Sequence, residues 1–209
     1  LTTTFLASKC KKIVSPAMNT AMFENQITQD NIAKLNKYGI GVVEPQNGLL
    51  ACGDVGAGKM PEPDFLFDVI EREIAREKDM LGKKVLVTAG ATMESLDPVR
   101  FLTNHSSGKM GFAIAKEAML RGAEVTVVKA NTTAEIPNFI KIVEVSSAKD
   151  MFDAVTVLSD QQDIIVKAAA VADYTPESYV DSKIKKKDGD LSIPLKRTMD
   201  ILKYLGENK

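Results

Sequence analysis

The stretch that decides the fold runs Val85-Leu-Val-Thr-Ala-Gly-Ala-Thr-Met-Glu-Ser-Leu-Asp-Pro-Val-Arg100 and continues to Asn104-His-Ser-Ser-Gly-Lys-Met-Gly111. Its β-branched start predicts a buried strand, which breaks at Gly90 into a long polar loop. After the loop the apolar spacing becomes helical. A strand, a loop and a helix start present backbone N–H groups to a phosphate. The candidate phosphate loop therefore consists of Ser106, Ser107 and Gly108.

Working outward, strand patterns alternate with helical patterns in this part of the chain. They predict strands at 83–88, 124–129, 140–145 and 163–168, and helices at 108–121 and 148–159. Such alternation is typical of a parallel sheet that helices cover. A last helix is predicted from about residue 200 to the terminus. The predicted fold class is therefore α/β, with a Rossmann-like parallel sheet.

Two common nucleotide loops do not fit the sequence. A nicotinamide-binding turn has the spacing G-x-G-x-x-G after the first strand and an acid at the end of the second strand. Here Gly90 is followed by Ala-Thr-Met-Glu, and the second strand ends in Lys129. A Walker A loop is excluded because Gly108-Lys109 is followed by Met110. Two alternatives to a nucleotide-using enzyme remain. One is a nicotinamide-dependent reductase, and the other is a regulatory module that binds a nucleotide without catalysis.

The residues before about 80 form a smaller and different pattern. Short strands are predicted at 12–15 and 41–44, and helices at 29–38 and 64–76. Glycine and proline are frequent at 46–63, which predicts a loop or flap. The charged end of the 64–76 helix leads into the next unit, so we predict domains at 1–80 and 81–209.

Composition excludes several classes of function. The 209 residues are 44% hydrophobic and 26% charged, which suffices for ordinary globular cores. A net charge of −1 gives no electrostatic reason to expect nucleic acid or an anionic membrane as a partner. No apolar run approaches the roughly 20 residues of a membrane span. Cys10 and Cys52 form neither a metal-binding nor a disulfide pattern, which favours a reduced, cytoplasmic setting.

Two segments downstream carry groups suited to a nucleotide. The run Lys167-Ala-Ala-Ala-Val-Ala-Asp173 offers small residues, against which a flat ligand can lie, and an acid just beyond a strand. A solvated loop acid is the alternative interpretation of Asp173. The lysine run 183–187 follows. Such runs are usually solvated, but a lysine beside a nucleotide can neutralise phosphate charge, and Lys183 is the candidate.

The first unit has two candidate residues of its own. Asn19, in Pro16-Ala-Met-Asn-Thr-Ala-Met22, could bind a carboxylate, although a helix cap is the more frequent role of asparagine. Cys52 lies in the glycine-rich segment 51–60. Most lone cysteines are inert, but one in a flexible flap is suited to donate a proton to a substrate.

Taken together and in order, these motifs resemble the bacterial bifunctional phosphopantothenoylcysteine decarboxylase / phosphopantothenate–cysteine ligase of coenzyme A biosynthesis. The Asn19 motif matches the family's P-x-M-N-x-x-M, and segment 51–60 matches its substrate-recognition flap. Segments 97–111, 168–174 and 183–186 match the ligase in turn. The resemblance implies that residues 1–80 are the C-terminal part of a flavoprotein α/β domain, the FMN-dependent decarboxylase. It implies that residues 81–209 are the CTP-binding ligase domain, without its C-terminal end.

The resemblance also implies roles for single residues. Asn19 holds the substrate carboxylate, and Cys52 protonates the enethiolate after decarboxylation. Asn104 acts at the acyl-cytidylate stage of the ligase. The position of Lys183 in a polar loop ten residues beyond Asp173 separately suggests that this lysine serves the activation step that forms the intermediate. The implied CTP contacts are Lys167, Ala168, Ala169, Asp173, Lys183, Thr198, Met199, Asp200 and Ile201. The family usually reads N-P-D-I at the last four of these positions, so Thr198 and Met199 depart from it.

The implied activity is CTP-dependent ligation of 4'-phosphopantothenate with cysteine, followed by FMN-dependent decarboxylation to phosphopantetheine. Mg²⁺ would offset the charge of the triphosphate, and the sequence assigns no ligands to it. A homo-oligomer is also expected. The family's catalytic histidine and most of its flavin site precede the position of Leu1, and His105 cannot replace that histidine. The end of the ligase follows Lys209, so the resemblance implies a fragment.

Overall fold

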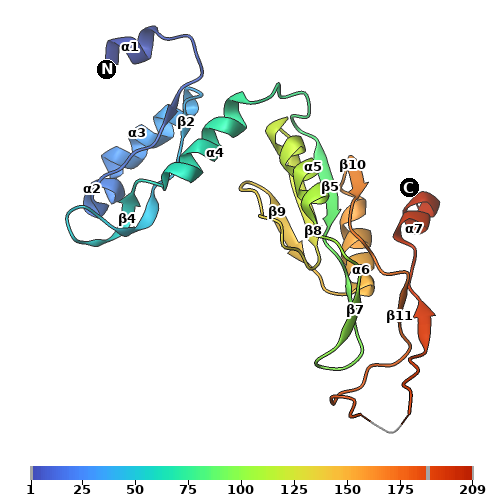
Figure 1. Ribbon diagram of the computed structural model, residues 1–209. Helices are drawn as coiled ribbons and strands as arrows, with labels where there is room; N and C mark the ends of the chain where they lie inside the picture. Colours follow the sequence, from blue (N-terminus) through green and yellow to red (C-terminus); the bar gives the residue numbers. More distant parts are fainter. Residues whose placement is uncertain (1, 187–188, 209) are drawn as a thin grey trace. The chain divides into compact units, whose positions relative to one another are not determined.

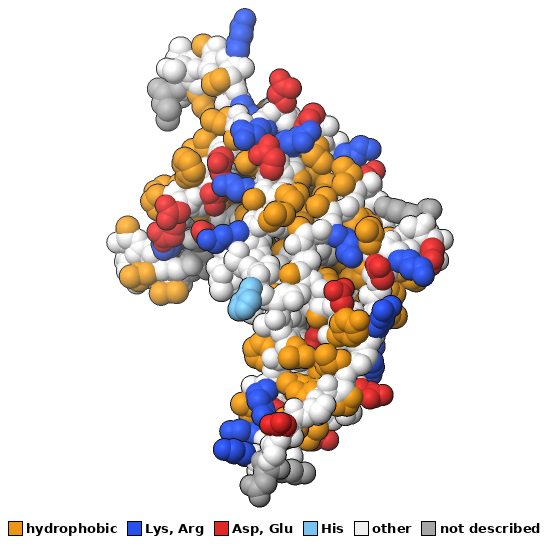
Figure 2. Space-filling view, turned by 45° about the vertical axis from the view of Figure 1, so that its right-hand side comes forward, with side chains coloured by type: hydrophobic (Ala, Val, Ile, Leu, Met, Phe, Trp, Pro, Cys, Tyr) orange, Lys and Arg blue, Asp and Glu red, His pale blue; other side chains and the backbone are white. Residues whose placement is uncertain are grey.

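The structure, a computed structural model, describes residues 2–186 and 189–208. The chain divides into two compact units, Leu1–Glu71 and Arg72–Lys209. In the part of the chain that is described, no helix has both the length and the apolar character needed to cross a membrane. Figure 2 shows acidic, basic and apolar side chains interspersed over the visible face, in keeping with a net charge of −1.

The first unit is built from short elements. Strands β1 (Ile13–Val14) and β2 (Gly41–Val42) pair in parallel, and β3 (Gln46–Leu49) and β4 (Val55–Lys59) form an antiparallel hairpin. The segment predicted as a loop or flap at 46–63 therefore contains a hairpin. The helices are α1 (Thr2–Ala7), α2 (Thr20–Glu24), α3 (Gln26–Lys37) and the first part of α4 (Pro63–Ile74).

The start and end of α3 follow from two residues next to it. Asn25 accepts the Ile27 N–H at 3.0 Å and so satisfies one of the free donors at the helix start. The helix therefore begins before the predicted residue 29. Gly39, with φ of 75°, ends the helical turn in the left-handed conformation that suits glycine.

The second unit contains the predicted parallel sheet. Its strands are β5 (Lys84–Ala89), β8 (Glu124–Lys129), β9 (Lys141–Glu144) and β10 (Ile164–Lys167). They lie in the order β10-β5-β8-β9, and every pair is parallel. The prediction of an α/β fold with a parallel sheet is confirmed, and Figure 1 shows the helices beside these strands.

Two apolar clusters cover the two faces of this sheet. Val85 and Val87 pack with helix α5 (Lys109–Leu120) on one face. Leu86 packs on the other face with α6 (Ala148–Ser159) and α7 (Ile201–Asn208). Because successive strand residues point to opposite faces, a run of apolar residues indicates a strand that is buried on both sides. Each such side chain contributes about 1.5–3 kcal/mol by burial.

The termini of α5 and α6 carry their own signals. Ser147 and Asp150 form a capping box at the start of α6, whose bounds agree with the predicted helix at 148–159. The buried Glu94 also accepts the Ala148 N–H, at 2.8 Å. Gly122, with φ of 94°, ends α5. These local signals explain why both helices were predictable from the sequence.

Two further hairpins lie in segments predicted as loops. β6 (Met93–Ser95) pairs with β7 (Phe101–Thr103) inside the polar loop after Gly90. β11 (Tyr174–Pro176) pairs with β12 (Leu195–Arg197) across the Lys-rich segment. Both segments were predicted without strands, and that prediction was wrong.

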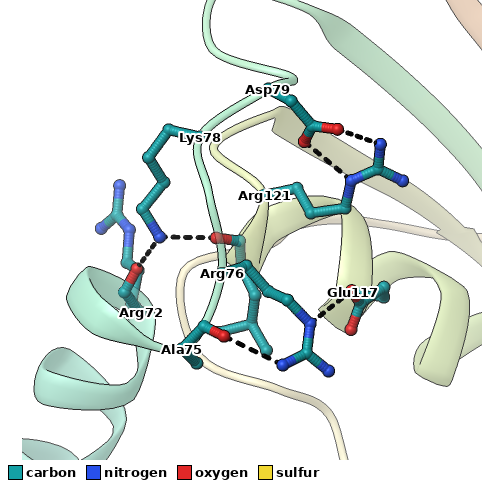
Figure 3. Close-up of polar contacts among 8 residues, drawn as sticks. Arg72, Ala75, Arg76, Lys78, Asp79, Glu117 and Arg121 are labelled. Atoms are coloured by element: carbon teal, nitrogen blue, oxygen red, sulfur yellow. Dashed lines mark hydrogen bonds and ion pairs between the residues drawn. The ribbon is translucent and has the colours of Figure 1, made fainter.

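The segment between α4 and β5 is hydrogen-bonded to the end of α5 (Figure 3). Lys78 Nζ donates to the carbonyls of Arg72 and Leu120, the latter at 2.6 Å. A cation at a helix C-terminus satisfies free carbonyls and complements the helix dipole. Two ion pairs add to it, Arg121–Asp79 and Arg76–Glu117. We call residues 72–79 the linker clasp; it belongs to the second unit.

Candidate functional site

The order of the strands creates a crevice in the second unit. β5 and β10 are neighbours, yet α5, which follows β5, and α7, which follows β10, cover opposite faces of the sheet. Where the chain leaves adjacent parallel strands toward opposite faces, the carboxyl ends of those strands open a crevice for a ligand. Residues after Ala89 and after Lys167 therefore line the site that the topology offers.

Gly90 directly follows β5 at this edge of the sheet. Its φ is 88°, and a Cβ there would lie 2.4 Å from the Asn131 carbonyl oxygen, so only glycine fits. The Gly90 carbonyl accepts the Ala170 N–H at 2.8 Å, and the Ala91 N–H donates to Asn131 at 2.9 Å. These bonds tie the exit of β5 to the exits of both neighbouring strands.

Three threonine hydroxyls hold the alanine run after β10. Thr88 Oγ1 accepts the N–H groups of residues 168 and 169, at 3.2 and 3.1 Å. Thr92 Oγ1 accepts the Ala172 N–H at 3.0 Å, and Thr198 Oγ1 donates to the Ala172 carbonyl at 2.7 Å. Thr88 and Thr92 are fully buried. The chain leading to Asp173 is therefore fixed before any ligand binds.

A pocket of about 410 Å³ lies at this place, and we call it the Asp173 pocket. It is lined by residues 167, 171–174 and 197–201. Lys167 and Arg197 can face phosphates, while Asp173 can accept hydroxyl protons from a sugar. The Lys203 N–H, which donates to Asp200 at 3.0 Å, then the Leu202 N–H and after it the Lys167 charge lower the pKa of Asp200.

Most of the predicted CTP contacts converge on this pocket. Lys167, Asp173 and the segment 198–201 all line it, although more than twenty residues separate Asp173 from Thr198 in the chain. Ala168 and Ala169 lie beside the pocket, with their N–H groups bound to Thr88. Lys183 lies in a different pocket.

The predicted phosphate loop lies on the β8 side of Gly90. A Cβ on Gly108 would meet Thr132 Oγ1 at 2.4 Å, and Thr132 donates to the Ser107 carbonyl at 2.6 Å. Ser106 and Ser107 hydroxyls accept N–H groups at the start of α5, both at 3.4 Å. These three residues do not line the Asp173 pocket. Asn104 reaches the crevice itself, because its Nδ2 donates to the Ala170 carbonyl at 3.4 Å.

The Lys183 pocket has a volume of about 710 Å³ and is lined by Arg100, residues 183–186 and residues 189–191. Its described lysines suit a polyanion; Lys187, also in the predicted run, lies outside the described residues. Arg100 pairs with the buried Asp97. The Arg100 guanidinium, and after it the Ile184 N–H, hold the pKa of Asp97 far below its usual range.

In the first unit, the hairpin brings Cys52 and Asn19 to one pocket. This Cys52 pocket has a volume of about 410 Å³ and is lined by residues 17–19, 49–52 and 58–60. Gly58 makes the approach possible, because a Cβ there would lie 2.1 Å from the Met18 carbonyl oxygen. Asn19 Oδ1 accepts the Met22 N–H at 2.9 Å, so its carbonyl caps α2. The exposed Cys52 thiol donates to Asp54 at 3.5 Å.

The two units differ in how well their residues suit the Mg²⁺ and the FMN that the resemblance implies. Across residues 2–186 and 189–208, no three His, Cys, Asp or Glu side chains cluster as a metal site. Asp173 and Asp200 nevertheless share one pocket, and Mg²⁺ is commonly held by one or two carboxylates together with substrate phosphates. In the first unit, β1 leads to the five-residue helix α2, whose start Asn19 already caps. Its described residues do not form a flavin phosphate cradle of their own.

Sequence reasoning did not single out Thr88, Thr92 or Arg197 as site residues. Thr88 lies within the buried strand β5 and Thr92 in the polar stretch after it, and only the fold shows that their hydroxyls accept N–H groups of residues 168, 169 and 172. Arg197 belongs to β12, a strand that was not predicted. The polar stretch that follows the strand at Gly90 is the sequence signal that could have pointed to Thr92.

Comparisons with known proteins match both units. Residues 80–209 match the family model described as DNA/pantothenate metabolism flavoprotein C-terminal domain, and residues 1–75 match the model described as flavoprotein. Coenzyme A biosynthesis bifunctional protein CoaBC of Bacillus subtilis is 44% identical over all of this chain and 52% of its own length. The protein of the same name from Vibrio vulnificus is 43% identical over 97% of this chain and 51% of its own length.

A solved structure agrees with these matches. The crystal structure of the C-terminal domain of Coenzyme A biosynthesis bifunctional protein CoaBC is 47% identical, with a TM-score of 0.55. The match covers 62% of this chain and 61% of that one. The chain spans about half the length of the curated relatives it matches.

Proposed function

Because the chain belongs to the DNA/pantothenate metabolism flavoprotein family, we propose that it is part of a bifunctional enzyme of coenzyme A biosynthesis. Residues 81–209 are then the first part of a Rossmann-like, CTP-dependent phosphopantothenate–cysteine ligase. Residues 1–80 are the C-terminal part of an FMN-dependent phosphopantothenoylcysteine decarboxylase. Both activities are proposed for a full-length, homo-oligomeric, cytoplasmic protein.

The observation that carries the ligase proposal is the Asp173 pocket. Lys167, Asp173 and residues 198–201 line one cavity at the carboxyl end of β10. This is the position at which open parallel sheets bind nucleotides. The pocket combines cations for phosphate with a carboxylate for ribose, which supports a nucleoside triphosphate as the ligand.

The proposed ligase reaction has two steps. A carboxylate oxygen of 4'-phosphopantothenate attacks the α-phosphorus of CTP, and pyrophosphate leaves, which forms the acyl-cytidylate. The cysteine nitrogen then attacks the acyl carbon, loses its proton, and CMP leaves. Asp173 binds the ribose and Lys183 offsets the charge that moves onto pyrophosphate. Asn104, whose amide lies at the crevice, donates to the acyl-cytidylate in the second step.

Mg²⁺ bound with the nucleotide would supply further charge compensation for the triphosphate. Asp173 and Asp200 are the two carboxylates of the pocket and would hold it together with phosphate oxygens. The Lys203 N–H, then the Leu202 N–H and after it the Lys167 charge lower the pKa of Asp200, which favours its carboxylate form.

In the decarboxylase, Asn19 and Cys52 act on the substrate. The side-chain oxygen of Asn19 caps α2. Its NH₂ group is therefore left as a donor, and its proposed role is to bind the substrate carboxylate. After carbon dioxide has left, the Cys52 thiol donates its proton to the enethiolate carbon. The glycine-rich turn around Cys52 allows the hairpin to close over the substrate and exclude water.

Calorimetric titration of the full-length protein with CTP, ATP and NADPH tests the ligase proposal. CTP binding is expected, and Asp173→Ala should weaken it by at least about tenfold, since a hydrogen bond to a charged group contributes about 1.5–3 kcal/mol. Asp160→Ala, an exposed acid at the end of α6, is the control and should leave CTP affinity unchanged. Binding of NADPH but not CTP would favour a reductase. CTP binding without pyrophosphate release would favour a regulatory module.

Serine variants of the two cysteines test the decarboxylase proposal. In the full-length, FMN-loaded protein, Cys52→Ser should still release carbon dioxide but stall before phosphopantetheine. Cys10→Ser removes the other exposed thiol and should turn over normally. Full turnover by Cys52→Ser would rule out the proton-donor role.

A further inference from the structure

The Asp97 carboxylate closes the turn between β6 and β7. Its side chain is fully buried, with an exposed fraction of 0%. Oδ1 accepts the N–H groups of Val99 and Arg100, each at 2.8 Å. Oδ2 accepts Nε and Nη2 of Arg100, at 3.0 and 2.6 Å. These bonds alone would define a stable local corner.

The same pair reaches a residue 87 positions further along the chain. The Ile184 N–H donates to Asp97 Oδ2 at 3.0 Å, and Arg100 Nη2 donates to the Ile184 carbonyl at 2.8 Å. Both backbone polar groups of Ile184 are therefore bound by one ion pair. Ile184 directly follows Lys183, so this contact fixes the backbone next to the lysine.

We propose that Asp97 is a positioning residue for Lys183, acting through the Ile184 backbone. The inference rests on the role proposed for Lys183 in pyrophosphate release. Between β11 and β12 the described residues form no helix or strand, so hydrogen bonds to other segments must set their position. Asp97 provides such a bond from a fully buried carboxylate, and a catalytic group gains from being held in place beforehand.

Asparagine cannot replace this carboxylate. The two oxygens of Asp97 accept five hydrogen bonds, from Val99, Ile184 and three groups of Arg100. An amide has a single acceptor oxygen, and its NH₂ group would face donors. Asp97→Asn therefore releases the Ile184 backbone while changing few atoms.

Hydrogen exchange tests the contact directly. In Asp97→Asn, amides of residues 183–186 should exchange at least about tenfold faster, because the segment opens locally. Asp163→Asn is the matched control. Asp163 also accepts a backbone N–H, from Lys84 at 2.8 Å, and pairs with Lys83, but at the amino end of the sheet. It should leave exchange at 183–186 unchanged.

Kinetics test the positioning role. In the full-length protein, Asp97→Asn should slow CTP-dependent pyrophosphate release about 100-fold, the scale of effect that misplacement of a catalytic group has. CTP affinity should stay within about threefold, because the Asp173 pocket is intact. In a Lys183→Gln background, adding Asp97→Asn should slow release no further. If Asp97→Asn does not fold, Ile184→Pro is the second test, because it removes the same N–H while Asp97 is kept, and it should slow pyrophosphate release in the same way.

Each outcome has a distinct meaning. Unchanged exchange at 183–186 in Asp97→Asn overturns the proposal. So does a slowing of pyrophosphate release by Asp97→Asn that adds to the slowing by Lys183→Gln, or one that Asp163→Asn also shows. Normal pyrophosphate release by Lys183→Gln would refute the proposed role of Lys183 and, with it, any catalytic consequence of this contact. The exchange result would then show whether Asp97 still fixes the segment.

Discussion

At Gly111, helix α5 packs directly on the backbone of β5. A Cβ at this position would lie 2.6 Å from the Ala89 Cβ and 3.0 Å from the Thr88 carbonyl oxygen, both on a buried strand. Neither neighbour can move without disturbing the sheet. The absence of a side chain at Gly111 therefore determines how closely the helix packs.

Gly111→Ala should destabilise the second unit by about 1–3 kcal/mol, because overpacking outweighs the gain in helix propensity. Gly206→Ala in α7 is the control, since a Cβ there meets nothing within 4 Å. That variant should be neutral or gain up to about 1 kcal/mol. Urea unfolding measures both, and equal midpoints for the two variants would contradict the packing argument.

Asp97 gives the second unit a specific acid sensitivity. Arg100 and the Ile184 N–H hold its folded-state pKa below the unfolded value of about 3.9. A lowered pKa stabilises the fold above the unfolded pKa, and this stability is lost as pH falls through the folded pKa. Thermal unfolding of the wild type should therefore depend more steeply on pH below about 4 than that of Asp97→Asn. Parallel curves would mean that Asp97 is not the group that titrates.

At the scale of elements, the sequence predicted those helices and strands that carry a local signal. The helix at 148–159 was predictable because Ser147 and Asp150 mark its start, and β5 because its apolar run is buried on both faces. The hairpin β6–β7 was missed, since its three-residue strands show no alternation and form only through pairing. The position of Lys183 relative to Asp173 likewise depends on the Asp97 contact, which no local pattern encodes.

The linker clasp is an element whose bonds can be tested one at a time. Lys78→Met keeps the aliphatic stem but removes the donor to the Leu120 and Arg72 carbonyls. It should cost about 1.5–3 kcal/mol, the range for hydrogen bonds to charged groups. Lys149→Met breaks the exposed pair with Asp153 and should have no measurable effect on the unfolding midpoint. Equal losses in both variants would show that the clasp is no stronger than a surface pair.

At the scale of the whole molecule, the clasp sets where the second unit can be cut. The family match begins at residue 80, but Arg76, Lys78 and Asp79 are bonded to the end of α5, and Ala75 and Met80 pack against the core. The free energy of unfolding of a fragment of residues 70–209 should be at least about 2 kcal/mol higher than that of residues 82–209. Chemical denaturation of the two fragments compares them. Identical stability would assign the clasp to the first unit or to neither.

The central position of β5 has a consequence for synthesis. β5 pairs with β8 and then with β10, whose Ile164 lies opposite Val85. A chain made from its N-terminus at about 5–20 residues per second completes β9 roughly one to five seconds before β10. During that interval the backbone of β5 that β10 will cover has no partner, and an unpaired strand templates aggregation. A nascent chain arrested near residue 160 should therefore recruit chaperones more strongly than one arrested beyond residue 200.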